Sequence, residues 1–257
     1  MTPYQEELAF ALSLADESRR ILLSHYGTHL QVEWKGDHSP VTRADREVEE
    51  TLRKRLAEAT PGYGIIGEEF GQEPGLIDRE WVLDPIDGTK AFIHHVPLFG
   101  TLISLLEKGK PVLGIIDLPV LGERVHATLG GGCFRNGKPC RVSEVNELGN
   151  ALILDGSITT MERLGHGTAW AGLREKARLH RGWGDCYGHF LVATGAAEVM
   201  ADPVVEIWDI APMGVILPEA GGCFTSFQGS ASIRERSGLS TNGRLHETVL
   251  NALNPSK

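Results

Sequence analysis

Two aspartates, Asp84 and Asp87, stand three positions apart at the end of an apolar run and are followed by a glycine and a threonine. The apolar residues 81–83 indicate the end of a buried strand, and Pro85 predicts that this strand stops there. Two carboxylates this close repel each other, so keeping both ionised in a half-buried place requires a cation. Oxygen ligands favour a hard divalent ion such as Mg²⁺, and backbone amides that open a helix favour phosphate. The stretch 84–89 therefore predicts a metal site beside a phosphate site.

Further carboxylates occur in comparable places along the chain. Glu68 follows a second apolar segment at about 63–66, so it would lie beside the first pair if the two strands are neighbours. Asp209 stands at the start of an expected helix in the second half, and Asp45 follows a threonine by three positions in front of an amphipathic run. The latter spacing resembles a helix capping box, which is a purely structural alternative for Asp45. Each acid alone has an ordinary structural explanation, but together they favour a phosphoryl-transfer site with two metal ions.

The composition is typical of a soluble globular protein. The 257 residues are 41% hydrophobic and 23% charged, which is enough to build one large domain or two halves. The formal net charge of −9 argues against a nucleic-acid surface. We find no long uncharged apolar run and no basic start followed by an apolar segment, so we expect neither a membrane span nor a secretory signal.

The thiols and imidazoles are too scattered to predict a site of their own. The cysteines lack a Cys-x-x-Cys pair, so we interpret them as isolated, buried structural thiols in a reducing cytoplasm. The histidines that could be taken for metal ligands lack zinc-type spacing, so we interpret them as surface or packing residues. The residues concerned are Cys133, Cys140, Cys186, Cys223, His94, His95, His180 and His189.

The pattern of elements divides the chain into two parts. Residues 1–146 are expected to hold two helices followed by a meandering sheet with hairpin turns at 107–110 and at Asn136-Gly137. Residues 147–257 are expected to alternate helix and strand, after a polar stretch at about 143–150. In this second half we expect helices at about 159–176, 186–196 and 209–220, and strands at about 151–155, 198–202 and 222–227.

Four segments resemble the signatures of the inositol monophosphatase family. They are Gly-Glu-Glu at 67–69, Asp-Pro-Ile-Asp-Gly-Thr at 84–89, Trp-Asp-Ile-Ala at 208–211 and Glu-Ala-Gly-Gly at 219–222. The resemblance implies an α/β fold, with an α+β first half and an α/β second half in a layered αβαβα sandwich of the inositol monophosphatase and fructose-1,6-bisphosphatase type. It also implies magnesium-dependent, lithium-sensitive phosphomonoesterase activity with two or three Mg²⁺ ions per site, and a homodimer.

Position by position, the resemblance assigns metal ligands in this chain. Glu68, Asp84 and the backbone carbonyl of Ile86 would hold the first ion. Asp84, Asp87 and Asp209 would hold the second, so that Asp84 bridges the two ions. Glu68 would also help to hold a weaker third ion.

The same resemblance assigns the remaining roles in the reaction. The amides of Gly88 and Thr89 would bind the phosphate. Asp45 and the Thr89 hydroxyl, together with Glu68, would act on a metal-activated water placed for in-line attack, without a covalent phosphoenzyme. Glu69 is interpreted as a residue behind the ligands or as a solvent-facing one.

The identity of the phosphate ester depends on finer detail. The segments 98–105 and 182–188 resemble the histidinol-phosphate phosphatase branch, and Ala91 stands where inositol phosphatases more often carry Asn. This branch hydrolyses L-histidinol phosphate to L-histidinol and phosphate in histidine biosynthesis. A physical argument favours the same substrate, because its ammonium and imidazole groups require acidic partners.

Candidate acidic partners for this substrate precede the last metal ligand in sequence. Asp185, Asp202 and Glu206 are these candidates, and Asp209 would contact the substrate as well. Arg181 is a nearby cation that, by resemblance, would approach the substrate. For each acid, a solvated loop charge is the structural alternative.

Other functions remain open at this point. An inositol-1-phosphate or broad sugar-phosphate phosphatase would use the same metals. A nucleotidase for 3′-phosphoadenosine 5′-phosphate would need more basic residues for the second phosphate. A non-catalytic regulator that only binds metal or a partner is disfavoured because every expected ligand is present.

Overall fold

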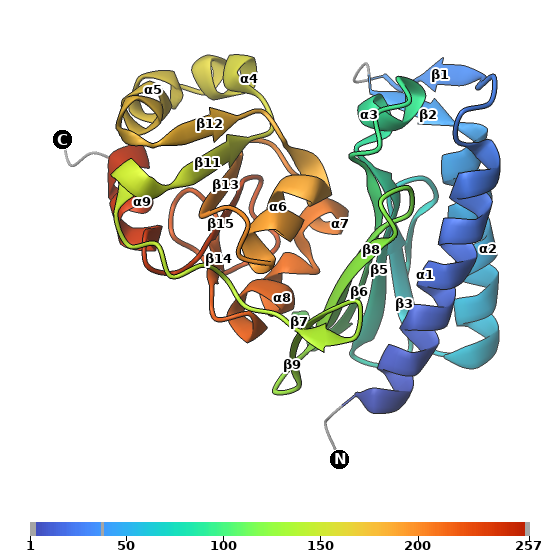
Figure 1. Ribbon diagram of the computed structural model, residues 1–257. Coiled ribbons are helices and arrows are strands. Elements are labelled where there is room, and N and C mark those ends of the chain that lie inside the picture. The colour runs from blue at the N-terminus through green and yellow to red at the C-terminus, as the bar shows by residue number, and fades with distance from the viewer. Residues whose placement is uncertain (1–3, 37–38, 255–257) are drawn as a thin grey trace.

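The computed structural model describes residues 4–36 and 39–254, which form alternating layers of helix and sheet (Figure 1). Two long helices cover one face of a large sheet, three shorter helices lie between that sheet and a smaller one, and further helices cover the outer face of the smaller sheet. This arrangement confirms the expected αβαβα sandwich. In chain order the helices are α1 (Gln5–His25), α2 (Arg43–Ala59), α3 (Thr89–Ile93), α4 (Ile158–Arg163), α5 (Gly167–Lys176), α6 (Asp185–Ala193), α7 (Ile207–Ile210), α8 (Met213–Glu219) and α9 (His246–Leu253). None of the helices in the described part of the chain combines the length and apolar character needed to cross a membrane.

The large sheet has the strand order β10-β9-β8-β7-β6-β5-β3-β4. β3 and β5 run parallel as neighbours, with Gly67 opposite Leu83, so the two strand ends that carry acids do meet as expected. The bounds are β3 (Gly64–Gly67), β4 (Gly71–Glu73), β5 (Arg79–Asp87), β6 (Gly100–Glu107), β7 (Lys110–Leu118), β8 (Glu123–Thr128), β9 (Gly132–Arg135) and β10 (Lys138–Pro139). A separate ribbon joins β1 (Val32–Trp34) to β2 (Pro40–Thr42).

The smaller sheet has the order β12-β11-β13-β15-β14. Its strands are β11 (Leu152–Asp155), β12 (Leu179–Arg181), β13 (Val199–Asp202), β14 (Cys223–Thr225) and β15 (Gly238–Thr241), preceded by a 3-10 turn at Leu148–Asn150. The predicted boundary between 1–146 and 147–257 falls in the connection between the two sheets and stays a prediction. Among the helices and strands of the second half, β12, β15 and α9 were not expected from the sequence.

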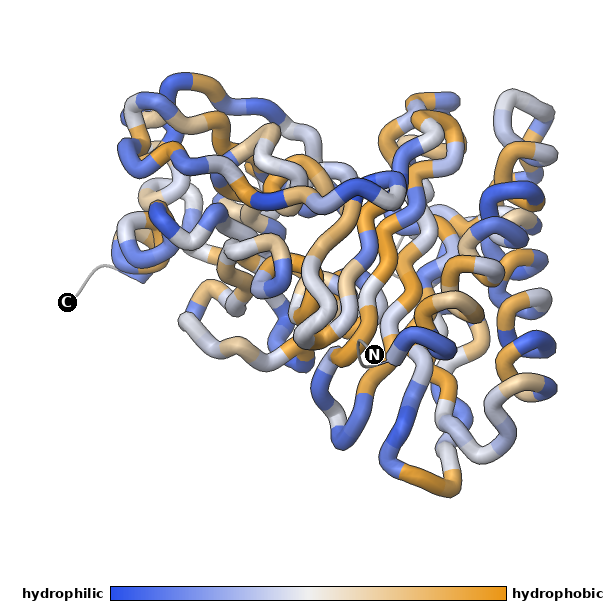
Figure 2. The backbone as a smooth tube through the Cα atoms, turned by 60° about the horizontal axis from the view of Figure 1, so that its bottom comes forward, coloured by the Kyte–Doolittle hydropathy of each residue, from blue (hydrophilic) through white to orange (hydrophobic). Residues whose placement is uncertain are grey.

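Burial of the large sheet on both faces explains its apolar strands. The hydrophobic stretches follow the strands through the middle of the molecule (Figure 2). Six residues of β6, from Thr101 to Leu106, are at most 1% exposed, because α1 and α2 cover one face and α6 to α8 the other. Gly114 of β7 allows the start of α8 to pack closely against the sheet. A Cβ at this position would lie 2.7 Å from the carbonyl oxygen of Pro212, which precedes α8.

The prediction that Pro85 ends its strand is wrong. β5 continues to Asp87, but its pairing with β6 shifts: Asp84 lies opposite Leu102 and Asp87 opposite Gly100. Two residues of β5 thus face the single residue Thr101, which is a β-bulge. Proline is compatible with a bulge because the ladder is interrupted there and its missing N–H is not needed.

Two expected helices are each divided in the structure. The segment expected at 159–176 forms α4 and α5, because Gly165 between them adopts a left-handed conformation with φ 84°. The segment expected at 209–220 forms α7, which begins at Ile207, and then α8. Pro212 cannot donate a backbone hydrogen bond and stands at the start of α8, where none is required.

The interpretation of the cysteines as isolated thiols is also only partly correct. All four thiols are free, but Cys133 and Cys140 face each other across the β9–β10 hairpin with their Sγ atoms 3.5 Å apart. The hairpin itself confirms the expected turn at Asn136 and Gly137, whose φ values are 48° and 76°. The two-residue loop brings the thiols together, which sequence spacing alone did not indicate.

Candidate active site

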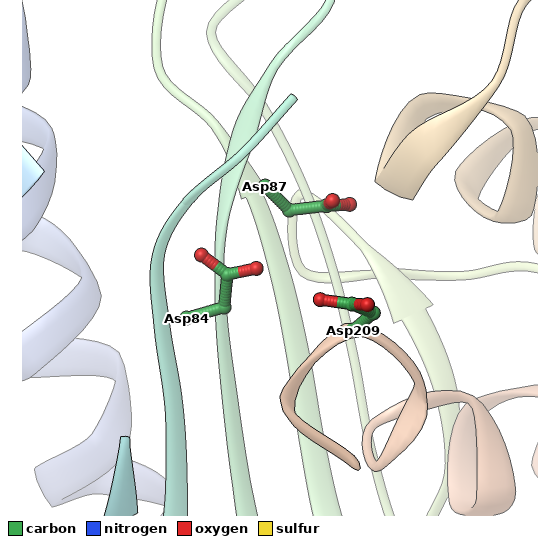
Figure 3. A group of neighbouring side chains, drawn as sticks. All are labelled: Asp84, Asp87 and Asp209. Atoms are coloured by element: carbon green, nitrogen blue, oxygen red, sulfur yellow. The ribbon is translucent and has the colours of Figure 1, made fainter. Parts of the chain in front are cut away.

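Three carboxylates from both halves of the chain converge at one place. Asp84 and Asp87 come from the bulged end of β5 and Asp209 from α7, and each offers an oxygen within 4.8 Å of the others. Figure 3 shows the three side chains pointing toward one another across the space between β5 and α7. Among the described residues, no histidine or cysteine belongs to this group. Oxygen-only groups in this arrangement suit Mg²⁺.

The crowding of these acids disfavours their charged forms. Burial, followed by the charges of Glu68 and Asp87, raises the pKa of Asp84 well above its usual value. Burial, followed by the charges of Asp185 and Asp209, does the same for the pKa of Asp87. Burial raises the pKa of Asp209 to about 7. A bound cation would reverse these shifts, so the donor set fits a divalent metal.

Backbone amides hold each of the three carboxylates in place. Ile86 N donates to Asp84 Oδ1 at 3.0 Å, Glu206 N donates to Asp209 Oδ2 at 2.8 Å, and Cys186 N donates to Asp87. Asp209 and Glu206, the residue just before α7, form a capping pair, so the Asp209 carboxylate closes the N-terminus of this short helix. These donors fix the orientation of the acids but leave other oxygens for a cation.

Glu68 lies beside this group but is paired with a lysine. Lys35 Nζ is 2.8 Å from Glu68 Oε1 and 2.7 Å from Glu69 Oε1. The Glu69 side chain is only 5% exposed, so it is a buried neighbour of the site and not a solvent-facing residue. Burial raises the pKa of Glu69 to about 7, even though Lys35 opposes the shift. Sequence reasoning missed Lys35, which stands in a loop with no motif around it.

Asp45 combines its structural role with an unused oxygen. The expected capping box at the start of α2 is confirmed, because Asp45 Oδ2 accepts hydrogen bonds from the N and the Oγ1 of Thr42, both at 2.7 Å. Its other oxygen, Oδ1, is buried and has no hydrogen-bond partner among the described residues. Burial raises the pKa of Asp45 to about 6, and Glu68 adds to the shift. A buried acceptor without a partner beside the acids can receive a hydrogen bond from a molecule bound there.

The turn after β5 depends on a glycine. Gly88 has φ 87°, and a Cβ there would lie 3.1 Å from Leu98 O. The turn leads into the short helix α3, whose first residue, Thr89, donates its hydroxyl proton to the Ile86 carbonyl oxygen at 2.9 Å. The structure thus brings together Ile86, Gly88 and Thr89, the three residues expected to hold metal and phosphate.

Two adjoining clefts open beside the acids, with volumes of about 530 and 560 Å³. Asp87, Asp185 and Asp209 line both clefts. Asp202 lines the first, and Glu68, Gly88, Thr89 and Glu206 line the second. All four acids expected to contact substrate therefore line the same clefts as the expected metal ligands Glu68, Asp87 and Asp209.

Arg181 lies away from these clefts, and the carboxylate of Glu206 already has a partner. Arg181 is exposed on β12, where its guanidinium bonds the carbonyl of His180, and it lines neither cleft. Glu206 reaches the second cleft, but its carboxylate is paired with Arg236 at 2.5 Å. Besides Lys35, which lines the second cleft, sequence reasoning missed the cleft residues Lys90, Arg163 and Arg236. Lys90 follows the recognised motif directly, which is a signal that could have identified it.

Burial and backbone conformation mark Asp185 and Asp202. Burial raises the pKa of Asp185, and Lys90 opposes the shift. Burial, followed by the charges of Asp185 and Asp209, raises the pKa of Asp202 well above its usual value. Asp185 also has φ 54°, a left-handed conformation that costs energy in a non-glycine residue. Half-buried acids with raised pKa values and strained backbone that face a cleft are typical of ligand-binding positions.

Known proteins share this fold and these motifs over nearly the whole chain. A histidinol-phosphatase from Chlorobaculum parvum is 42% identical over 98% of this chain and 97% of its own length. A histidinol-phosphatase from Mycobacterium tuberculosis is 39% identical over 97% of this chain and 98% of its own length. The solved structure of the extragenic suppressor protein suhB from Bartonella henselae matches with a TM-score of 0.91 and 29% identity, covering 98% of this chain and 100% of that one. The family model for the inositol monophosphatase family matches residues 4–257, and the chain belongs to this family.

Proposed function

We propose that this phosphomonoesterase is Mg²⁺-dependent and hydrolyses L-histidinol phosphate to L-histidinol and phosphate. The observation that carries the proposal is the placement of Asp185 and Asp202 in the cleft that Asp87 and Asp209 also line. The similarity to curated histidinol-phosphatases supports the same substrate. Action in histidine biosynthesis, a cytoplasmic location, lithium sensitivity and a homodimer remain predictions.

The chain's own residues divide the work of this reaction. Asp84, Asp87 and Asp209, with Glu68 and the Ile86 carbonyl, would hold the ions. Bound Mg²⁺ would supply charge neutralisation at the phosphate and activation of a water. Asp45, through its unpaired Oδ1, would accept a proton from the attacking water.

The phosphate and the rest of the substrate would be held by different parts of the cleft. The amides of Gly88 and Thr89 would bind the phosphate oxygens. Asp185 and Asp202 would face the ammonium and imidazole groups of histidinol, whose positive charge offsets the cost of two half-buried acids. Arg236 already neutralises Glu206, so Glu206 would contribute less.

Two rival substrates fit the cleft less well. Inositol phosphate carries no positive charge to match Asp185 and Asp202. An adenosine bisphosphate requires cations for a second phosphate, but of the cations that line the clefts Arg236 is paired with Glu206 and Lys35 with Glu68 and Glu69. Among the described residues this leaves Lys90 and Arg163.

The substrate assignment predicts a clear order of turnover. We expect kcat/KM for histidinol phosphate to exceed that for inositol 1-phosphate and 3′-phosphoadenosine 5′-phosphate by at least about tenfold, because only histidinol phosphate pairs with the half-buried acids. Phosphate release with Mg²⁺ measures all three in parallel. A preference for either rival contradicts the substrate, and no turnover of any ester supports a non-catalytic protein.

Asp202→Asn separates recognition from chemistry. We expect KM for histidinol phosphate to rise about 10- to 100-fold, because the variant keeps the shape but loses the charge that faces the substrate. Turnover of p-nitrophenyl phosphate, which lacks the cationic groups, should change less than about threefold. The exposed Glu235→Gln, which removes a charge from a loop beside the cleft, is the matched control and should leave both substrates unaffected. Equal losses on both esters from Asp202→Asn would assign Asp202 to structure.

Asp84→Asn tests the metal assignment. We expect activity to fall by about 1,000-fold or more, because a charged carboxylate that would hold the metal is lost. The increase in melting temperature that Mg²⁺ gives the wild type should disappear, while the metal-free variant should melt at a higher temperature than the metal-free wild type, because one repelling charge is gone. Asp78→Asn, an exposed residue just before β5, is the matched control. Near-normal Mg²⁺ stabilisation in Asp84→Asn would contradict the assignment.

The raised pKa values predict how stability depends on pH. Asp45 and Asp209, with pKa values of about 6 and 7, hold protons in the folded state that the unfolded chain releases near pH 4. Their contribution to metal-free stability is therefore full at low pH and is lost as pH rises toward about 7. Mg²⁺ would replace the proton of Asp209 and disfavour that of nearby Asp45, so the increase in melting temperature that it produces should grow from about pH 5 to pH 7.

Comparing the melting temperature with and without Mg²⁺ isolates this effect, because the contributions of acids elsewhere cancel in the difference. Glu33 and Glu123, for example, have lowered pKa values owing to their arginine partners and contribute equally with and without Mg²⁺. Melting curves in Mg²⁺ and in chelator at several pH values provide the test. If Mg²⁺ increased the melting temperature by the same amount at pH 5 and pH 8, Asp45 and Asp209 would not belong to the surroundings of the metal.

A further inference from the structure

The bulge in β5 is what allows two aspartates to face the same space. In a regular strand, side chains three positions apart point to opposite faces of the sheet. Asp84 and Asp87 have this spacing, yet their carboxylates approach each other within 4.8 Å. The extra residue opposite Thr101 reverses the alternation and brings Asp87 back to the side of Asp84. Whatever holds the bulge therefore also holds the distance between the two acids.

One side chain donates a hydrogen bond to the carbonyl of Pro85, which lies in the bulge where the pairing of β5 with β6 is interrupted. Thr101 Oγ1 donates to Pro85 O at 2.9 Å, and Thr101 is 1% exposed. Ser18 Oγ, from α1 and fully buried, lies 2.6 Å from Thr101 Oγ1. A hydroxyl has one proton, and that of Thr101 goes to Pro85, so Ser18 must be the donor to Thr101. The result is a directed chain of hydrogen bonds from α1 to the bulge.

An ion pair fixes α1 next to this chain. Arg19, which follows Ser18, binds Asp117 of β7 with its Nε and NH2 atoms at 3.0 and 2.7 Å. Asp117 is fully buried and lies opposite Thr101 in the β6–β7 pairing. The position of Ser18 is therefore set by a neighbouring contact that does not touch the site.

We propose that Thr101, supported by Ser18, is a positioning residue for the metal-holding end of β5. Its hydroxyl fixes the direction of the Pro85 peptide, and thereby the orientation of Ile86 and the spacing between Asp84 and Asp87. This inference rests on the proposed metal assignment. It goes beyond that assignment because neither Thr101 nor Ser18 lines a cleft or belongs to the carboxylate group.

Thr101→Val removes the hydroxyl and keeps the shape of the side chain. Titration calorimetry of the chelator-treated protein with Mg²⁺ should give a Kd raised about tenfold, the cost of one buried hydrogen bond that orients the ligands. The Mg²⁺ concentration needed for half-maximal hydrolysis of p-nitrophenyl phosphate should rise in parallel, while kcat at saturating Mg²⁺ falls less than about threefold. Thr101→Ser should restore the Kd to within about twofold of the wild type, because it restores the donor.

Ser104→Ala is the matched control on the same strand. Ser104 is fully buried and donates to Leu113 O at 2.7 Å, within the β6–β7 ladder and away from the bulge. The Ser104→Ala variant should have a lower melting temperature and a Kd for Mg²⁺ within about twofold of the wild type. If Thr101→Val does not fold, Ser18→Ala replaces it, with an expected Kd increase of about threefold from the weakened hydrogen-bond chain.

The outcomes separate this inference from the proposed function. Wild-type protein that binds no Mg²⁺ would refute the metal assignment and the positioning role together. Wild-type binding with an unchanged Kd in Thr101→Val, or in Ser18→Ala where that variant replaces it, would refute only the positioning role. A raised Kd in Ser104→Ala as large as that in Thr101→Val would also refute it, because general destabilisation would then explain the loss.

Discussion

Repulsion between carboxylates that share a poorly solvated space is the interaction on which the site and much of its surroundings depend. Asp84, Asp87 and Asp209 would not stay together as ions without compensation, and burial raises the pKa of each. The fold supplies partial compensation through single backbone amides and through Lys35 beside the neighbouring glutamates. It stops short of neutralising the group with arginines. The negative charge that remains uncompensated is what would give a divalent cation its affinity for this site.

Assembling these acids requires the two halves of the chain to meet closely. Asp209 lies on α7, in the helical layer that packs between the two sheets, and the corner between α7 and α8 contacts β7 where Gly114 leaves room. α6, in the same layer, sends an amide to Asp87. The central helices therefore complete a site that begins in the large sheet, and packing of the sheets against this layer fixes the distances between ligands.

Local signals in the sequence predicted the parts of the site that depend on near neighbours. The cap at Asp45 and the strand end before Glu68 each follow from a few adjacent residues. The bulge could not be predicted in this way, because Pro85 is equally compatible with the end of a strand, and the partner that satisfies its carbonyl, Thr101, comes from another strand. Lys35 and the division of the expected helix at Gly165 likewise depend on contacts or backbone angles that sequence spacing does not encode.

The position of Asp185 would link the proposed substrate recognition to the proposed metal ligands. Its left-handed backbone turns the chain so that the next amide, that of Cys186, donates to Asp87. Its own side chain meanwhile faces the cleft that Asp202 also lines, and Gly156 is required there because a Cβ would lie 2.9 Å from Asp202 Oδ1. A substrate cation that neutralises Asp185 would relieve its repulsion with Asp87, which contributes to the raised pKa of that ligand. The same negative charge also attracts a metal ion at Asp87, so the cationic end of the ester and the metal would share the field of Asp185, while the phosphate of the ester supplies the attraction between ester and metal.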